Sequence, residues 1–463
     1  MSKVSGAPLR AVPFKITNPE LIPSKRYYDE TFFELEREHL WPHVWQMACR
    51  LEEIPNLGDW IEYKILDKSV ILVRGKKGVQ AFHNACRHRG VQLATGHGNC
   101  KTSGFICPFH GWRFSMDGEN TFVFGRGIFS EDVLDQAELN LVPCRVELWG
   151  GCAFINFDND APPLIDTMKP IADRLDVRNV DKLKVEWWVS SVLPTNWKLA
   201  MEAFMEGYHV MRTHPQLYAQ PYDPSQKAEA DVGGSPARAR TSRQVVETFV
   251  HHMELLGDGM GGMVSKSDIA IAHELIESGI ELPEDPTQTV PAFMLHLNDE
   301  ITTRARARGI DMPDLNYLRA NNPAAPVEFI FPHYFLLPQF GNMSSYRIRP
   351  LTAETCLFEL WSLMLYPEDE QRERPVAPTP TPHDSESFPE IPKQDYSNLP
   401  LQQFGLHALG FENMRLSKDV EGLISNYQRV IDGFLEGRDK NELAKAIEIG
   451  SGPLGVPIQD IGF

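Results

Sequence analysis

Hydrophobic and polar residues alternate over much of the first half of the chain. From about residue 58 to 157, short runs such as DWIEYKI, SVILVRG and CAFINF are rich in β-branched and aromatic residues, and Gly, Asn and Asp separate them. This period of two, interrupted by turn residues, predicts antiparallel strands and an all-β segment. Before it, residues 28–50 have the apolar spacing of an amphipathic helix, which we expect to end near Pro42.

After residue 160 the pattern becomes a mixture of helical and strand-like runs. Residues 196–215 (NWKLAMEAFMEGYHVMRTHP) predict a helix that stops at its last residue, a proline. The runs EFIFPHYFLLPQFGNMSSYRIRPL and TCLFELWSLMLY predict strands of a second sheet. Residues 219–240 predict a loop, the Pro-rich stretch 367–400 a surface excursion, and residues 415–448 a helical region broken near Gly437. The sequence therefore predicts an α+β protein.

The length of 463 residues is too great for one ordinary core. We expect a helical segment at 1–44 that packs with the third domain, a β-rich domain at 45–160, and a mixed domain at 161–463. The formal net charge of −18 disfavours nucleic-acid or membrane binding. Seven cysteines are too few for a disulfide framework, and neither a secretory signal nor a spanning apolar run is present. These features predict a cytoplasmic protein.

Two cysteines of the β-rich segment are each followed closely by a histidine. Cys86 and His88 form a Cys-x-His, and Cys107 and His110 form a Cys-x-x-His. Structural zinc is the usual meaning of two Cys and two His, but zinc fingers pair Cys with Cys and His with His. The interleaved order instead favours a two-iron cluster with both cysteines on one iron and both histidines on the other.

A second candidate site lies in residues 196–215. Helical spacing would place Glu202, Glu206 and His209 on one face, and a loosened helix end would bring His214 beside His209. Two histidines and a distant carboxylate form the ligand set of non-haem Fe(II) oxygenases. The Glu-x-x-His at Glu206, with another at Glu36–His39, leaves a di-iron carboxylate site open.

The segments CRHRG and CPFHGW resemble the signature of Rieske [2Fe–2S] proteins. Followed by NWK…E…EGYH…H, they make the whole chain similar to the large (α) subunit of Rieske non-haem iron ring-hydroxylating oxygenases. The resemblance implies a Rieske domain placed before a catalytic domain of helix-grip-like type, in which an antiparallel sheet is combined with helices. It assigns the cluster to Cys86, His88, Cys107 and His110.

The resemblance also implies roles in the catalytic domain. His209 and His214 would bind mononuclear iron, and Glu206 would hydrogen-bond a Rieske histidine of the neighbouring subunit. Asp419 is the expected third iron ligand, because it lies nine residues before Gln428; Glu421 and Glu412 are the alternatives. The family often has Asn at the position of Ala203, so any role of that amide is missing here. The expected lining of a substrate pocket, which core packing would also explain, is Met201, Phe204, Met205, Phe293, Met294, Phe331 and Phe335.

The implied activity is that of an oxidoreductase, a terminal oxygenase that uses O₂ to mono- or dihydroxylate a small hydrophobic, aromatic substrate, as in aromatic hydrocarbon catabolism. Oxidative O- or N-demethylation within the family is one alternative. A Rieske electron-transfer protein with an inactive second iron site is another.

Electrons must come from outside, because the Gly-x-Gly-x-x-Gly at 257–262 follows a helical run rather than a strand. A ferredoxin and/or flavin reductase, itself using NAD(P)H, is therefore implied. Basic residues near the cluster motif are candidates for docking an acidic carrier; they are Arg87, Arg89, Lys101, Arg113 and Arg126. The resemblance further implies a homotrimer, with or without small β subunits, in which the cluster of one chain serves the iron of the next.

Overall fold

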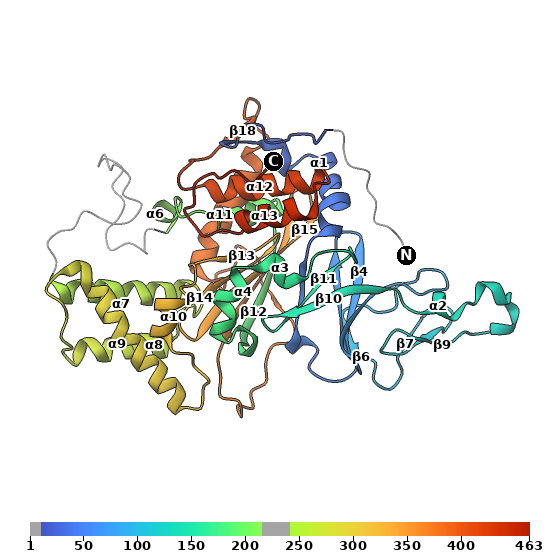
Figure 1. Cartoon of the computed structure of the whole chain (residues 1–463), viewed down its shortest axis with the longest axis horizontal. Coiled ribbons are helices and arrows are strands. Elements are labelled where there is room, and N and C mark those ends of the chain that lie inside the picture. The colour runs from blue at the N-terminus through green and yellow to red at the C-terminus, as the bar shows by residue number, and fades with distance from the viewer. Residues whose placement is uncertain (1–10, 215–240) are drawn as a thin grey trace. The chain divides into compact units, whose positions relative to one another are not determined.

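The computed structural model describes residues 11–214 and 241–463. The chain separates into two compact units, which we describe individually. The smaller unit contains Leu35–Thr167, and the larger contains residues 11–34 together with Met168–Phe463. Helices and mainly antiparallel sheets confirm the predicted α+β class (Figure 1). The predicted loop at 219–240 lies outside the described residues.

The smaller unit is built on a seven-stranded antiparallel sheet with the order β2-β11-β10-β5-β4-β3-β6. Its strands are β2 (Gln46–Arg50), β3 (Asp59–Ile65), β4 (Lys68–Gly75), β5 (Gly78–His83), β6 (His97–Asn99), β10 (Pro143–Trp149) and β11 (Cys152–Asn156). A second, three-stranded sheet contains β7 (Phe105–Ile106), β8 (Arg113–Phe114) and β9 (Asn120–Phe122). The alternating sequence pattern therefore does encode a segment that is mainly β, although the short helix α2 (Gln136–Leu139) lies within it.

The centre of β4 anchors the hydrophobic core of this unit. Its residues 70–73 are fully buried, because both faces of the strand are covered. Ile71 and Val73 belong to a core cluster that also includes Cys86, Cys107 and Trp112. The two cysteine–histidine loops are thus attached to the packed interior of the unit.

The larger unit contains a six-stranded sheet with the order β13-β14-β15-β16-β12-β17. Its strands are β12 (Lys184–Leu193), β13 (Glu328–Ile330), β14 (Tyr334–Pro338), β15 (Asn342–Thr352), β16 (Thr355–Met364) and β17 (Thr379–Pro380). Phe335 pairs with Tyr346, and Phe358 pairs with Ile348, two residues further along β15. Because strand side chains alternate, these three aromatic rings lie on one face of the sheet.

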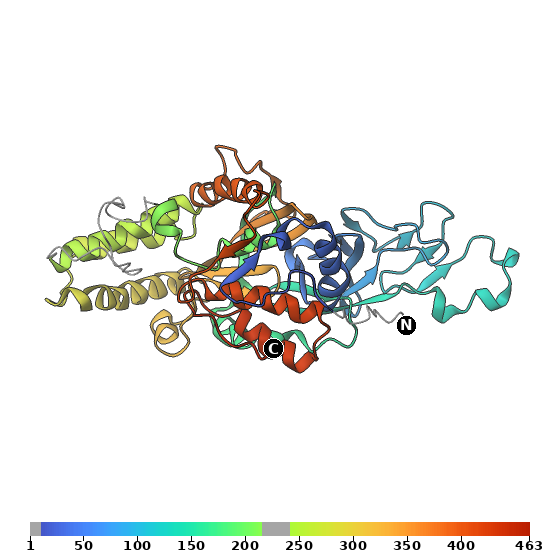
Figure 2. The same ribbon diagram turned by 90° about the horizontal axis from the view of Figure 1, so that it is seen from above.

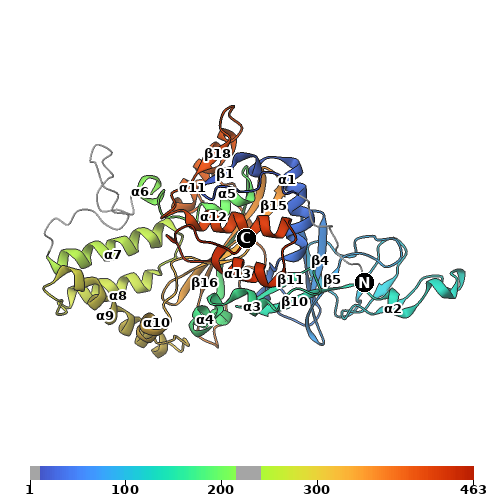
Figure 3. The ribbon, with the colours of Figure 1, turned by 45° about the horizontal axis from the view of Figure 1, so that its top comes forward.

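Helices surround this sheet. They are α4 (Ile171–Leu175), α5 (Trp197–Glu202), α6 (Val210–Thr213), α7 (Ser242–Gly259), α8 (Lys266–Glu277), α9 (Pro286–Ala307), α10 (Leu315–Asn321), α11 (Glu390–Gly405), α12 (Gly422–Leu435) and α13 (Lys440–Gly450). Helices α7 to α10 pack on one another (Figure 2). Helix α5 lies close to β15 and contacts α11, and α12 packs along α13 (Figure 3).

The remaining elements are short. They are β1 (Leu21–Pro23), β18 (Asn413–Arg415), α1 (Glu30–Leu35), α2 (Gln136–Leu139) and α3 (Leu164–Met168). Strands β1 and β18 pair, which ties the start of the larger unit to its C-terminal part. Helix α1 itself ends at Leu35, and the chain continues as a π-helical turn (Glu36–Leu40) and a 3₁₀ turn (Trp41–His43), so the helical turns end near Pro42.

The helix predicted over residues 196–215 is interrupted, which corrects the expectation of one helical face. Helix α5 ends at Glu202, and α6 begins only at Val210. The carboxylate of Glu206 accepts the backbone N–H of His209 at 3.0 Å, in place of a helical carbonyl. A side chain that takes over a backbone donor in this way starts a new helical turn. The break therefore precedes both histidines, whereas it was expected between them.

The surface excursion predicted at 367–400 is wrong in its last part, because α11 begins at Glu390. Pro392 lies in the first turn of α11, where backbone N–H groups have no partner within a helix, so the proline is tolerated. Pro400 lies further along the same helix. The break predicted near Gly437 is confirmed, since this residue has a φ of +67° between α12 and α13.

Candidate metal centres

The two cysteine–histidine loops share one backbone pattern. The N–H of Gly90 donates to the carbonyl of Cys86 at 2.9 Å, and that of Gly111 donates to the carbonyl of Cys107 at 3.0 Å. The N–H of each cysteine donates to the carbonyl five residues later, at 2.8 Å in both loops. Both glycines have a left-handed backbone conformation, with φ of +73° and +70°, which residues with a Cβ atom rarely adopt. The sequence repeat thus produces two similar loops.

The loops bring two sulfur and two nitrogen donors together. The thiols of Cys86 and Cys107 are buried, and burial, with the other thiol nearby, raises the pKa of Cys86 to about 11. The rings of His88 and His110 lie with centroids 4.6 Å apart, and the Nδ1 atom of each is buried without a protein partner. His88 also stacks on Trp112 at 4.9 Å, which fixes the plane of its ring.

Unpartnered buried nitrogens beside two buried thiols indicate that the site binds an electrophile such as a metal ion. A single tetrahedral zinc needs all four donors close together. However, the described residues contain one group of three or more His, Cys, Asp or Glu side chains whose donor atoms all lie within 4.8 Å of one another. That group is His209, His214 and Asp395. The wider spacing at the loops fits a two-iron cluster with cysteines at one end and histidines at the other.

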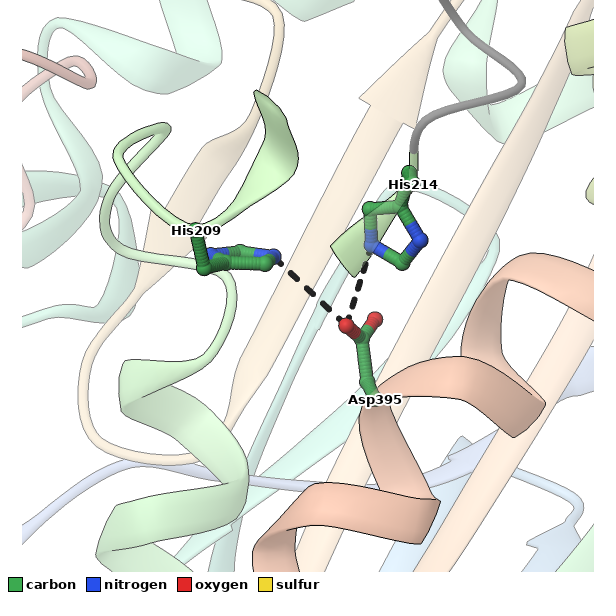
Figure 4. A group of neighbouring side chains, drawn as sticks. All are labelled: His209, His214 and Asp395. Atoms are coloured by element: carbon green, nitrogen blue, oxygen red, sulfur yellow. Dashed lines mark ion pairs between the residues drawn. The ribbon is translucent and has the colours of Figure 1, made fainter. Parts of the chain in front are cut away.

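That second group lies in the larger unit and joins three segments (Figure 4). His209 precedes α6, His214 follows it, and Asp395 lies in the first half of α11. The Oδ1 atom of Asp395 is 3.0 Å from Nε2 of His214 and 3.5 Å from Nε2 of His209. His214 and Asp395 are buried, and His209 is partly exposed. Two imidazole nitrogens and one carboxylate oxygen therefore converge on a common point.

The other nitrogen of each ring is held by a hydrogen-bond acceptor. Nδ1 of His209 donates to Glu206, and Nδ1 of His214 donates to Oε1 of Gln394 at 2.6 Å. These contacts fix the tautomer in which Nε2 carries a lone pair, which is the form that binds a metal. Burial alone would lower the pKa of His209, but Glu206 and Asp395 raise it above its ordinary value.

Asp395 replaces Asp419 as the carboxylate of this group, which corrects the expected third ligand. Asp419 is exposed in the turn before α12 and does not belong to the group. Glu412 is exposed as well. Burial, with the carboxylate of Glu206 nearby, raises the pKa of Glu421. No local signal in the sequence marks Asp395, because it lies 181 residues after His214, within the Pro-rich stretch 367–400.

A cavity of about 510 Å³ adjoins two of the three residues, His209 and Asp395. Glu202, Glu206, His209 and Asp395 line it, together with apolar residues of α5 and α11. Glu421 lies in its wall. None of the seven side chains expected to line a pocket contributes to this cavity.

Those seven side chains are distributed over separate packing sites. Phe204 contacts Phe335 at 4.6 Å, on the aromatic face of the sheet. Phe331 packs against Tyr427 and Phe434 of α12 instead. Met201 and Met205, which are close to Phe204 in the sequence, are buried. Phe293 packs against Phe249 within helices α7 and α9, and Met294 is the next residue of α9.

The aromatic face of the sheet contacts residues that are neighbours in sequence of Glu206 and Asp395. Phe204 lies 5.0 Å from Tyr346 and precedes Glu206 by two residues. At the other end, Phe358 lies 4.6 Å from Tyr396, the residue that follows Asp395. These aromatic residues are thus close in sequence to two residues of the site, but none of their rings lines the cavity.

Comparison with known proteins gives two family matches. Residues 180–437 match the model of the ring hydroxylating alpha subunit (catalytic domain). Residues 44–122 match the Rieske [2Fe–2S] domain. The two matches contain all seven donor residues described above.

Individual relatives are also similar over part of their length. The carnitine monooxygenase oxygenase subunit of Escherichia coli is 32% identical over 197 residues, which are 42% of this chain and 52% of that protein. The glycine betaine monooxygenase oxygenase subunit of Chromohalobacter salexigens is 34% identical over 197 residues, 42% of this chain and 43% of that protein. The chain thus spans about half the length, or less, of the curated relatives it matches.

A solved structure supports the fold. Naphthalene 1,2-dioxygenase with indole bound in its active site superposes with a TM-score of 0.61 and 22% identity, covering 93% of this chain and 96% of that one. In the part of the chain that the structure describes, we find no helix with the length and apolar character needed to cross a membrane.

Proposed function

Because the chain belongs to the ring hydroxylating alpha subunit family and contains a Rieske [2Fe–2S] domain, we propose that it is the terminal oxygenase component of a multicomponent Rieske non-haem iron oxygenase. The observation that carries the proposal is the presence of two complete donor sets. The loops provide two thiols and two imidazoles, and the larger unit provides two imidazoles and a carboxylate. We assign the cluster domain to residues 45–160 and the catalytic domain to residues 161–463, with the segment 1–44 packing on the latter. The placement of residues 11–34 in the larger unit supports this for that part of the segment, whereas residues 35–44 and 161–167 fall in the smaller unit.

The donor sets determine which groups could be held. Cys86 and Cys107 would hold one iron of the cluster, and His88 and His110 the other. His209, His214 and Asp395 would hold mononuclear iron. A Rieske cluster supplies single electrons at a potential of about −150 to +300 mV, and a three-ligand Fe(II) leaves open positions for O₂.

The protein's own contribution is to orient these donors. Glu206 and Gln394 hold the Nδ1 atoms, so both Nε2 atoms face Asp395. Glu206 also shapes the backbone at His209, so one carboxylate fixes both the position and the tautomer of that ligand. A hydrogen bond from Glu206 to a Rieske histidine of a neighbouring subunit in a homotrimer stays a prediction.

Electrons are proposed to come from a ferredoxin or a flavin reductase, which in turn would use NAD(P)H. The Gly-x-Gly-x-x-Gly at 257–262 lies at the C-terminal end of α7 rather than after a strand, so it lacks the context of a dinucleotide fingerprint. Arg87, Arg89 and Arg113 are exposed near the cluster loops, which supports docking of an acidic carrier there.

The proposed reaction is hydroxylation of a small hydrophobic, aromatic compound, supported by the apolar residues of α5 and α11 that line the cavity beside the donor group. A second candidate is oxidative demethylation of a quaternary ammonium compound. The carnitine and glycine betaine monooxygenase relatives favour a substrate of this class, and the carboxylates that line the cavity also suit a cationic trimethylammonium group. The matched segments cover 42% of this chain, so they support this substrate class without assigning it.

The test is O₂ uptake and product formation with a reductase, an NAD(P)H source and a substrate panel of an arene, carnitine and glycine betaine. We expect product that depends on O₂ and on the reductase, and formaldehyde from a methylammonium substrate in the demethylation case. Asp395→Asn is the control with an incomplete iron site. Absence of turnover on the panel, with an intact cluster signal, would instead favour an electron-transfer protein with an inactive second site.

A further inference from the structure

Glu202 is a buried carboxyl group that the ligand sets do not use. It is the last residue of α5 and is 5% exposed. Its carboxyl oxygens accept hydrogen bonds from the hydroxyl of Tyr27, at 3.0 and 3.1 Å, and from the amide of Gln428. Both donors are neutral, so the hydrogen bonds alone bring no compensating charge.

The cations nearest to Glu202 are engaged with other groups. Arg26 donates to Asp432, to the Gln428 carbonyl and to Phe14, and its ion pair with Asp432 is buried. Lys198, on the same helix as Glu202, lies over the rings of Tyr27, Phe32 and Trp197 at about 5.5 Å. Glu202 forms no ion pair within the described residues, unlike Asp432 of the same network.

This environment favours the protonated carboxyl. Burial raises the pKa of Glu202 to about 7, although the hydrogen bonds from Gln428 and Tyr27 and the charges of Lys198 and Arg26 act in the opposite direction. The group therefore exchanges its proton near neutral pH, whereas an ordinary glutamate is ionised there.

Glu202 also lines the cavity of about 510 Å³ that contains Glu206, His209 and Asp395. The wall of this cavity includes the exposed residues Gln402 and Arg415 at the surface of the protein. One continuous space thus connects solvent, the buried carboxyl and the donor group, and it is large enough for several waters.

The proposed oxygenase reaction consumes protons. Monohydroxylation balances as R–H + O₂ + 2 e⁻ + 2 H⁺ → R–OH + H₂O, with electrons from the external reductase, and dihydroxylation of an arene also takes up two protons. Three acids other than Glu202 line the cavity. Glu206 and Asp395 are engaged with the histidines, and Glu421 accepts the backbone N–H of Ser417 at 2.7 Å.

We propose that Glu202 is the proton donor for this reaction, releasing its proton into the cavity water beside His209 and Asp395 and regaining one from solvent through the same cavity. The inference rests on the proposed oxygenase function. For each of the two protons consumed in a cycle, the Glu202 O–H bond breaks, the proton passes to water and onward to reduced oxygen, and the carboxylate then regains a proton from bulk water.

The first test is independent of turnover. The infrared absorption of protonated carboxyl groups is followed against pH in the metal-free protein and in Glu202→Gln. We expect the wild type to show a buried carboxyl that titrates near pH 7, and we expect this band to be absent from the variant. A wild-type spectrum identical to that of Glu202→Gln at every pH would overturn the proposal.

The second test uses the pH dependence of the rate. The wild-type rate should fall as pH rises through about 7, because the donor is then ionised. Glu202→Gln should keep its iron and thermal midpoint, lose roughly 100-fold or more in rate, and show no such fall. Glu354→Gln is the matched control. It makes the same chemical change at a glutamate that lies outside the cavity and forms a hydrogen bond with His407. An unchanged rate and pH profile in Glu202→Gln would overturn the proposal.

A third variant covers the case in which Glu202→Gln does not fold. Tyr27→Phe keeps the carboxyl but removes a hydrogen bond that lowers its pKa, so the infrared titration and the rate profile should both move to higher pH. Movement of only one of them would overturn the proposal. If the wild type turns over no substrate, the oxygenase function fails instead, and the infrared result still stands.

Discussion

The carboxylate that completes the histidine pair is the residue on which the iron site depends most. Asp395 is buried with its Oδ1 near both Nε2 atoms, whereas Asp419 is exposed. Asp395→Asn should therefore lose the mononuclear iron while keeping the cluster. We expect iron per chain to fall from about three to about two, with acid-labile sulfide unchanged.

Asp419→Asn is the matched control, because it makes the same chemical change in the residue that sequence spacing favoured. It should keep about three irons. Iron and sulfide analysis, together with electron paramagnetic resonance of the reduced cluster, distinguishes the two variants. Loss of iron from Asp419→Asn but not from Asp395→Asn would contradict the assignment.

Gln394 is expected to set the orientation of His214. Its side-chain oxygen accepts the Nδ1 proton at 2.6 Å, so Gln394→Leu leaves the ring free to rotate. Loss of such a partner typically weakens metal binding by roughly 10- to 100-fold. Titration of the iron-free protein with Fe(II) or Co(II) measures this change. Gln394→Glu retains an acceptor and should bind nearly as tightly as the wild type; equal weakening in both variants would exclude the positioning role.

The cluster loops could be predicted from the sequence because each loop supplies one sulfur and one nitrogen within three positions. The same applies to His209 and His214. Asp395 and Gln394 could not be found this way, since they approach the histidines only through folding of a helix 180 residues later. Nothing in the local pattern around Asp395 distinguishes it from a helix-surface acid.

At the scale of elements, α12 is held at its start by very close packing. A Cβ atom on Gly422 would lie 2.2 Å from the backbone of Pro457, so the C-terminal segment would have to move. Gly422→Ala should destabilise the protein by roughly 1–3 kcal/mol. Gly405 in α11 is the control, because a Cβ atom there meets nothing within 4 Å, and its change to Ala should leave stability unchanged or slightly higher. Denaturant unfolding compares the two; an equal loss would contradict the packing argument.

Strands were predicted more reliably than helices, and the reason is visible in α5 and α6. The apolar positions of residues 196–214 have helical spacing throughout, yet the chain leaves the helix after Glu202. The Glu206 side chain competes for the His209 backbone, and this contact is not encoded in periodicity. Likewise, Pro392 and Pro400 argued against α11, although tertiary packing buries Asp395, Tyr396 and Leu399 in it.

At the scale of the whole molecule, the two donor sets belong to different compact units. The four proposed cluster ligands lie in Leu35–Thr167, where Cys86 and Cys107 belong to the core, while the histidine–aspartate group lies in the larger unit. A bound metal stabilises the folded form of the unit that holds it, because the unfolded chain does not keep the site. Each metal centre should therefore stabilise mainly its own unit.

Calorimetry of two variants tests this separation. His110→Ala removes a cluster ligand and should lower the midpoint of one thermal transition, that of the smaller unit. Asp395→Asn should lower only the other transition, relative to the iron-loaded wild type. The loss of iron and of sulfide in each variant identifies which centre is gone. If both variants lower both transitions equally, the units unfold as one cooperative body, and the ligand sets stabilise the chain as a whole.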